Sequence, residues 1–122
     1  MVVHGFAFKE VVQPPTWSEL ESTLRAELRD AGARFDNGNA YWTLQLCRLL
    51  ASLVTRDVVR SKLDSASWAL ARLPQHAQPI IEVAARYYRH EPRQGDADLF
   101  RASYPSFYTT IRSLAEAVPP LT

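Results

Sequence analysis

The segment from Asn39 to Val54 is apolar on nearly all sides, and it constrains the fold more than any other part of the chain. A helix with so little polar surface is stable only where neighbouring elements cover it on most sides. The sequence therefore predicts a bundle in which this segment is the central helix. Its apolar residues are Trp42, Leu44, Leu46, Cys47, Leu49, Leu50, Leu53 and Val54.

The first predicted helix begins at a capping box. The Thr16 hydroxyl can cap the helix, and Glu19, three residues later, can bond back to the Thr16 backbone. Residues 1–15 are expected to form a short extended lead-in, because the pair Pro14–Pro15 cannot continue a helix or a ladder. Apart from a weak hint near the start, no stretch sustains the period-two alternation of a strand, which predicts an all-α fold.

Three more helices are predicted after the central one, at residues 61–73, 79–90 and 96–118. Ser61 and Asp64 form a second pair of capping residues, and prolines separate the segments. Pro105 lies inside the last segment and predicts a kink or a split near Tyr104. The whole chain, residues 1–122, is interpreted as one all-α domain, a bundle of about five helices.

The composition argues against several classes of function. The net charge is +1 with acids and arginines interspersed, so no nucleic-acid partner is expected. The single cysteine, Cys47, excludes an internal disulfide and is expected to be a small buried hydrophobe. The three histidines, His4, His76 and His90, have no metal-ligand spacing, so no metal site is expected in the chain alone.

No targeting or membrane segment is recognisable. No apolar run approaches the roughly 20 residues that a membrane span needs. The first ten residues lack the basic region and the long apolar stretch of a signal peptide. We therefore expect a cytoplasmic protein without a membrane partner.

Two charged residues occupy positions that need an explanation. Lys62 lies at the start of a predicted helix. Its side chain is either solvated, or it is a point charge that holds a phosphate together with the backbone N–H groups of the helix start. Arg48 lies within the apolar helix, where a guanidinium must find a partner. That partner is either an acid across the bundle, such as Glu82 or Asp64, or an anionic ligand.

Aromatic and acidic residues of the later helices also have two interpretations each. Tyr87 and Tyr88 occupy different helix faces, so one is expected in the core and the other in a freer position. Trp68 is interpreted as a core residue. Asp96 and Asp98 suit the start of a helix electrostatically and are interpreted as capping acids rather than metal ligands.

The order of these features resembles the C-terminal helical domain of the streptomycin/spectinomycin adenylyltransferases. The apolar helix carries one arginine in W-T-L-Q-L-C-R-L-L, and a lysine at 62 precedes W-A-L-A-R-L-P at 68–74. A Q-P pair then begins a helix that ends in two tyrosines. The resemblance covers essentially the whole chain and is strongest between Leu44 and Tyr88.

The resemblance implies that the chain is one half of an enzyme. In that family a small α/β nucleotidyltransferase domain carries the metal-binding aspartates and the catalytic base, and the helical domain closes over ATP and the aminoglycoside. Nothing in this chain matches the catalytic domain. No catalytic residue is therefore expected, and the chain alone should not transfer AMP from ATP to an aminoglycoside hydroxyl.

The resemblance also implies a cofactor, partners and site residues. ATP with Mg²⁺ is expected only in an assembly with a catalytic domain. That domain would be supplied either by a separate nucleotidyltransferase chain or by a longer enzyme of which this chain is a fragment. Lys62 and Tyr88 match the lysine and tyrosine that contact the triphosphate, and Arg48 matches an arginine on the apolar helix. The family holds its cationic antibiotic with acids just before the apolar helix. Asp36 is the only acid there and is the candidate aminoglycoside contact.

Two alternatives stay open on the sequence. The chain can be a free-standing binding or protein-interaction module that kept the fold and lost the chemistry. It can also be a helical RNase of the kind that is paired with minimal nucleotidyltransferases, in which four to six residues separate an Arg and a His on one helix. Here only three residues separate Arg72 from His76, and Arg86 from His90.

Overall fold

The computed structural model describes residues 16–32, 40–57 and 61–119, and in this part the chain forms α-helices and one 3₁₀ turn without strands. The predicted all-α bundle of about five helices is therefore confirmed. The predicted lead-in and the segment around Asp36 lie outside the described residues. The elements are α2 (Trp17–Gly32), α3 (Ala40–Thr55), α4 (Lys62–Arg72), η2 (Gln75–Ala77), α5 (Gln78–Tyr88) and α6 (Asp96–Glu116).

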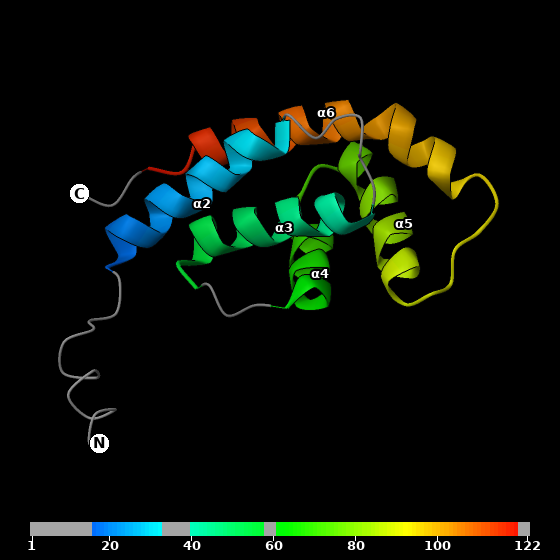
Figure 1. Ribbon diagram of the computed structural model, residues 1–122, viewed down its shortest axis with the longest axis horizontal. Helices are drawn as coiled ribbons and strands as arrows, with labels where there is room; N and C mark the ends of the chain where they lie inside the picture. The colour runs from blue at the N-terminus through cyan, green and yellow to red at the C-terminus, as the bar shows by residue number, and fades with distance from the viewer. Residues whose placement is uncertain (1–15, 33–39, 58–60, 120–122) are drawn as a thin grey trace, which may run out of the picture.

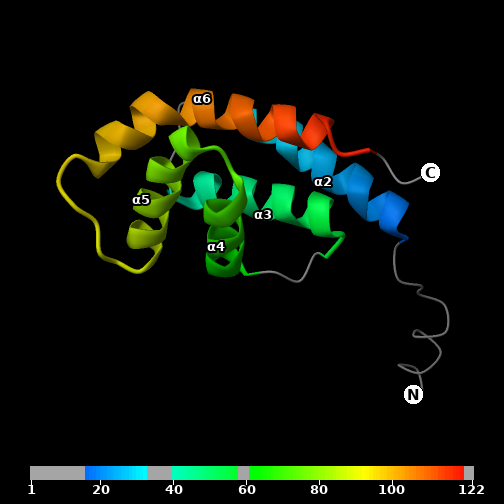
Figure 2. The same cartoon turned by 180° about the vertical axis from the view of Figure 1, so that it is seen from behind.

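Helix α3 is the centre of the bundle, as its composition predicts. Figure 1 shows α2 and α6 along one side of α3, α4 on the other, and α5 beside the N-terminal end of α3. The reverse view in Figure 2 shows the same arrangement. All four helices pack against α3. Its buried residues are Thr43, Leu44, Leu46, Cys47, Leu49, Leu50, Ala51, Ser52 and Leu53.

Helices α2 and α6 are joined by hydrogen bonds in which a side chain of one helix donates to a backbone carbonyl of the other helix or of the residues that follow it. The Tyr108 hydroxyl of α6 donates to the Leu28 carbonyl of α2 over 3.0 Å. Arg25 of α2 donates to the carbonyls of Ala115 and Val118, both over 3.0 Å, and pairs with Glu21 on its own helix. The two Arg25 bonds go to carbonyls at and just beyond the C-terminal end of α6, where carbonyls lack the N–H partner that a further turn of helix would supply.

The predicted capping residues begin their helices. The Glu19 backbone N–H donates to the Thr16 hydroxyl over 3.2 Å, and the Thr16 N–H donates to the Glu19 carboxylate over 2.8 Å. This is the complete capping box. At the start of α4, the Asp64 N–H donates to the Ser61 hydroxyl over 3.0 Å.

Of the two outcomes predicted at Pro105, a kink or a split, the split does not occur, because α6 runs through the proline. Figure 1 shows one continuous, curved helix. Proline removes one intrahelical hydrogen bond and crowds the preceding turn. Tyr104 just before it and Phe107 just after it are both buried in the core. Packing on both sides of the proline therefore holds the helix together and leaves Pro105 exposed.

Asp96 fixes the start of α6 against α5. Its carboxylate accepts hydrogen bonds from the Arg86 guanidinium, over 2.9 Å, and from the Arg93 backbone N–H, over 2.8 Å. Asp98 is exposed and pairs with Arg101. Both acids stand in the first turn of α6, as predicted, but neither caps the helix, because the N-cap is Gly95 and no side chain makes a capping hydrogen bond there. Within the described part of the chain, no helix has the length and apolar character of a membrane span.

Candidate functional site

A hollow of about 500 Å³ lies where the start of α3 meets the end of α5. Two of its side chains are large and exposed, Tyr41 by 53% and Tyr88 by 50%. We call this surface the tyrosine hollow. Its lining residues are Ala40, Tyr41, Tyr87, Tyr88 and His90.

Lys62 adjoins the tyrosine hollow from a third helix. Its ammonium nitrogen lies 4.9 Å from the centroid of the Tyr41 ring, within the range of a cation–π contact. Lys62 is the first residue of α4, where backbone N–H groups lack intrahelical partners and favour an anion. Lys62 thus contacts Tyr41, and Tyr41 lines the hollow together with Tyr88.

The two neighbouring tyrosines of α5 have different surroundings. Tyr87 packs edge-on against Phe100 of α6, with the ring centroids 5.2 Å apart, and belongs to the margin of the core. Tyr88 is half exposed. The prediction that one of the pair packs in the core and the other is freer is confirmed. Trp68 is also in the core, as predicted, and is 8% exposed.

His90 completes the hollow at the end of α5. Its backbone is left-handed, with φ of 62°. The His90 N–H donates to the Tyr87 carbonyl over 3.0 Å, and the Glu91 N–H donates to the Arg86 carbonyl over 2.8 Å. This pair of bonds is the Schellman pattern, in which the left-handed residue is usually glycine. His90 and Tyr41 were not among the predicted site residues. In the sequence, the signal for His90 is that no glycine follows the end of this helix, so another residue must take the left-handed position.

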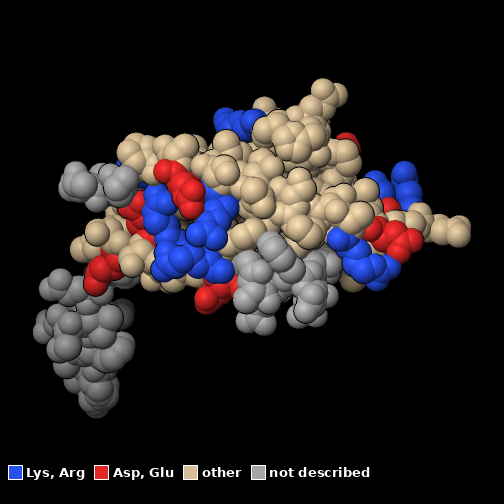
Figure 3. Space-filling view, turned by 90° about the horizontal axis from the view of Figure 1, so that it is seen from above, with Lys and Arg blue, Asp and Glu red and all other residues tan. Residues whose placement is uncertain are grey.

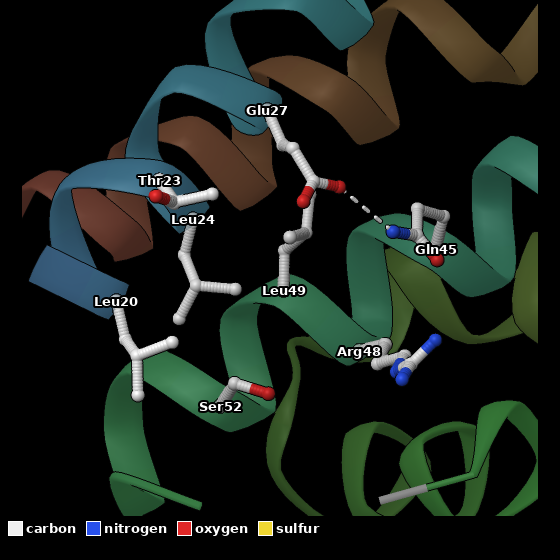
Figure 4. Close-up of a pocket in the computed structure, with 8 residues that line it drawn as sticks. All are labelled: Leu20, Thr23, Leu24, Glu27, Gln45, Arg48, Leu49 and Ser52. Atoms are coloured by element: carbon white, nitrogen blue, oxygen red, sulfur yellow. Dashed lines mark hydrogen bonds between the residues drawn. The ribbon is translucent and has the colours of Figure 1, made fainter. Parts of the chain in front are cut away.

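Arg48 lies outside the tyrosine hollow. It lines a separate hollow of about 200 Å³ between α2 and α3, together with Glu27, Gln45 and Ser52. Figure 4 shows Glu27 of α2 accepting a hydrogen bond from Gln45, over 3.0 Å, while the Arg48 side chain is directed away from α2.

Arg48 has no hydrogen bond or ion pair with any residue in the described part of the chain. Neither Glu82 nor Asp64 is therefore its partner, so the ion pairs suggested with these two acids are wrong. The reason is geometric, because Glu82 lines a hollow between α4 and α5, whereas Arg48 lines the one between α2 and α3.

The surface over α2 and α6 mixes both signs of charge. Figure 3 shows basic side chains grouped with acidic ones at one end of this face. Arg25, Arg29 and Arg112 line a small hollow there with Glu116. Arg25 and Arg112 are each paired with an acid on their own helix, Arg112 with Glu116 over 3.1 Å. The positive charge of this group is thus largely compensated.

Cys47 is unsuited to nucleophilic chemistry. Its side chain is fully buried in α3, and the loss of solvation raises the pKa of the thiol to about 12. A thiol with so high a pKa remains protonated and unreactive near neutral pH. Within residues 16–32, 40–57 and 61–119, no three His, Cys, Asp or Glu side chains are grouped as metal ligands.

Comparison with known families decides the relationship. A sequence profile described as aminoglycoside adenylyltransferase, C-terminal domain, matches residues 10–105 of the 122-residue chain. The chain belongs to this family. The matched region includes α2 to α5 and the first half of α6, and therefore Arg48, Lys62 and Tyr88. Searches of curated proteins and of solved structures found no match.

Proposed function

We propose that this chain is the helical, substrate-closing domain of an aminoglycoside nucleotidyltransferase. In this role it contacts the triphosphate of ATP, and AMP transfer to an aminoglycoside hydroxyl occurs only in an assembly with a catalytic domain. That domain, on a separate nucleotidyltransferase chain or in the same longer enzyme, supplies the Mg²⁺-binding carboxylates and the base in the cytoplasm. Asp36 is proposed to contact the cationic aminoglycoside.

One observation carries the proposal, the position of Lys62 over Tyr41 at the edge of the tyrosine hollow. A lysine at a helix start suits a phosphate group, because the ammonium charge adds to the field of the backbone N–H groups. The exposed faces of Tyr41 and Tyr88 suit the base or sugar of a nucleotide. The hollow thus combines an apolar surface with one adjoining cation, as a nucleotide requires.

Arg48 has a more distant role in this proposal. It follows Tyr41 by seven residues, so the two lie on the same face of α3 and roughly 10 Å apart along its axis. An anionic ligand that extends from the tyrosine hollow along α3 would approach the Arg48 guanidinium. Such a ligand would satisfy a charge that has no partner among the described residues.

The proposal is tested by an amide-resolved NMR titration of the full 122-residue chain with Mg²⁺-ATP and then with streptomycin. We expect chemical-shift changes around Tyr41, Lys62 and Tyr88 at millimolar ATP. Lys62→Ala should weaken ATP binding roughly tenfold, the usual loss for one charge-assisted hydrogen bond.

Arg72→Ala is the matched control for Lys62→Ala. Arg72 also belongs to α4 and also lies over an aromatic ring, 5.2 Å from the Trp68 centroid, but it stands at the other end of the helix. The two variants therefore lose the same charge and a similar contact. No shifts in the wild type would mean that the chain has no usable ATP site outside an assembly with the catalytic domain. Equal effects of the two variants on ATP binding would overturn the proposal. The free-standing interaction module would then explain the chain better.

A further inference from the structure

His90 occupies a backbone conformation that ordinarily selects glycine. Its φ of 62° is left-handed, and apart from glycine only a few residue types, His among them, adopt this region with any frequency. Glycine would accept the same turn without the steric cost of a Cβ. A side chain held at such a position beside a candidate site suggests a role in that site.

The cap at the end of α5 brings the His90 side chain to the tyrosine hollow. His90 lines the hollow with Tyr41 and Tyr88. It is exposed, and its imidazole has no hydrogen bond or ion pair with any residue in the ranges that the structure describes. The ring nitrogens can therefore bond to a molecule in the hollow.

The same cap reduces the electrostatic obstacle to an anion at this end of α5. The last carbonyls of a helix carry partial negative charge, which would repel a phosphate. Here the carbonyls of Ala85, Arg86 and Tyr87 accept hydrogen bonds from the N–H groups of the capping residues. Because these carbonyls are bonded within the chain, they present less negative potential to the hollow.

We propose that His90 is a further phosphate-binding residue of the tyrosine hollow. It donates an imidazole N–H to the phosphate chain from the end of α5, while Lys62 approaches from the start of α4. Imidazole offers an N–H donor in both its neutral and its charged form. This inference rests on the proposed function and extends it by naming a residue that the family resemblance did not supply.

The test compares two glycine substitutions at left-handed positions. Arg56 has φ of 58° and directly follows the last residue of α3, and it lies near Trp17 rather than in the tyrosine hollow. His90→Gly and Arg56→Gly therefore give the same kind of backbone relief at two different places. Thermal midpoints should stay the same or rise in both variants, because glycine accepts these conformations without strain.

Binding should separate the two variants. The affinity of the full chain for inorganic tripolyphosphate and for Mg²⁺-ATP is measured by NMR titration. We expect His90→Gly to weaken both affinities about five- to tenfold, as for one lost hydrogen bond to a charged group, and Arg56→Gly to leave them unchanged. His90→Asn tolerates the left-handed backbone and offers an N–H donor, so it should retain most of the binding.

The outcomes distinguish this inference from the proposed function. If His90→Gly binds like the wild type while Lys62→Ala is weakened, the role of His90 is wrong and the proposed function stands. If Arg56→Gly is weakened as much as His90→Gly, the effect is not local to the hollow and the inference is overturned. A wild-type chain that binds neither probe would overturn the inference about His90, because the chain alone would then have no phosphate site, and it would leave the proposed function to the assembly with a catalytic domain.

Discussion

At the scale of single residues, burial determines which ionisable groups keep their protons. Desolvation raises the pKa of Cys47 to about 12, and it also raises the pKa of Tyr104, with a smaller contribution from Tyr108. Both groups are neutral in the folded chain near neutral pH. In the unfolded chain the Cys47 thiol is hydrated and ionises near its ordinary pKa of 9.0.

The raised thiol pKa predicts a loss of stability in alkali. The stability that Cys47 contributes is complete below about pH 9 and falls as the pH rises toward 12, because only the unfolded chain releases the proton in that window. The slope for one group is about 1.4 kcal/mol per pH unit. Urea unfolding measured from pH 8 to pH 11 should show this decline.

Cys47→Ala is the control for the alkaline decline. The variant should be less stable near neutral pH because it leaves a small cavity, and its free energy of unfolding should fall less steeply above pH 9. A slope identical to that of the wild type would assign the decline to other groups, Tyr104 first among them.

At the scale of elements, contacts between helix ends hold the bundle in register. Asp96 shows this most clearly, since one carboxylate joins the Arg86 side chain of α5 to the backbone that precedes α6. Its side chain is 7% exposed and that of Arg86 is 23% exposed. A carboxylate with so little exposure to solvent stabilises the fold only through the groups that bond to it. Its removal leaves the partly buried Arg86 guanidinium without a charge partner.

Asp96→Ala should therefore lower the free energy of unfolding by about 3 kcal/mol, in the range for breaking a largely buried ion pair. Urea denaturation at pH 7 measures the change. Asp98→Ala is the matched control, because Asp98 stands two residues later on the same helix turn and its pair with Arg101 is exposed. The control should cost about 0.5 kcal/mol or less. Equal losses would mean that the Asp96 contacts do not join α5 to α6.

At the scale of the whole molecule, stability depends on the central helix. Because α3 packs against α2, α4, α5 and α6, no outer pair of helices encloses the core without it. A single domain of this size is expected to unfold in one cooperative transition. Damage to α3 should therefore weaken every helix together, rather than the nearest one alone.

Leu46→Ala tests this dependence. Leu46 is fully buried in α3, so its truncation should cost about 2–5 kcal/mol through lost burial and a residual cavity. Hydrogen exchange should show lower protection in α2 and α6 as well as in α3. Val54→Ala, on the same helix but 46% exposed, should change the stability little. Loss of protection confined to α3 would contradict a single cooperative unit.

The sequence by itself determined the helices and the family. The capping box at Thr16, the cap at Ser61 and the apolar segment around Leu46 are local signals, and local signals fix where helices begin and which one is central. The order of the apolar helix with its arginine, the W-A-L-A-R-L-P segment and the helix that ends in two tyrosines indicated the family, and the matched region contains all three.

Only the tertiary structure decided how these helices combine into surfaces. Lys62, Tyr41 and Tyr88 come from three helices, and their meeting depends on how those helices pack. The same packing places Arg48 in a different hollow and keeps α6 continuous through Pro105. Such outcomes depend on contacts between residues that are distant in sequence. The energies of these contacts cannot be inferred from the local pattern of residues.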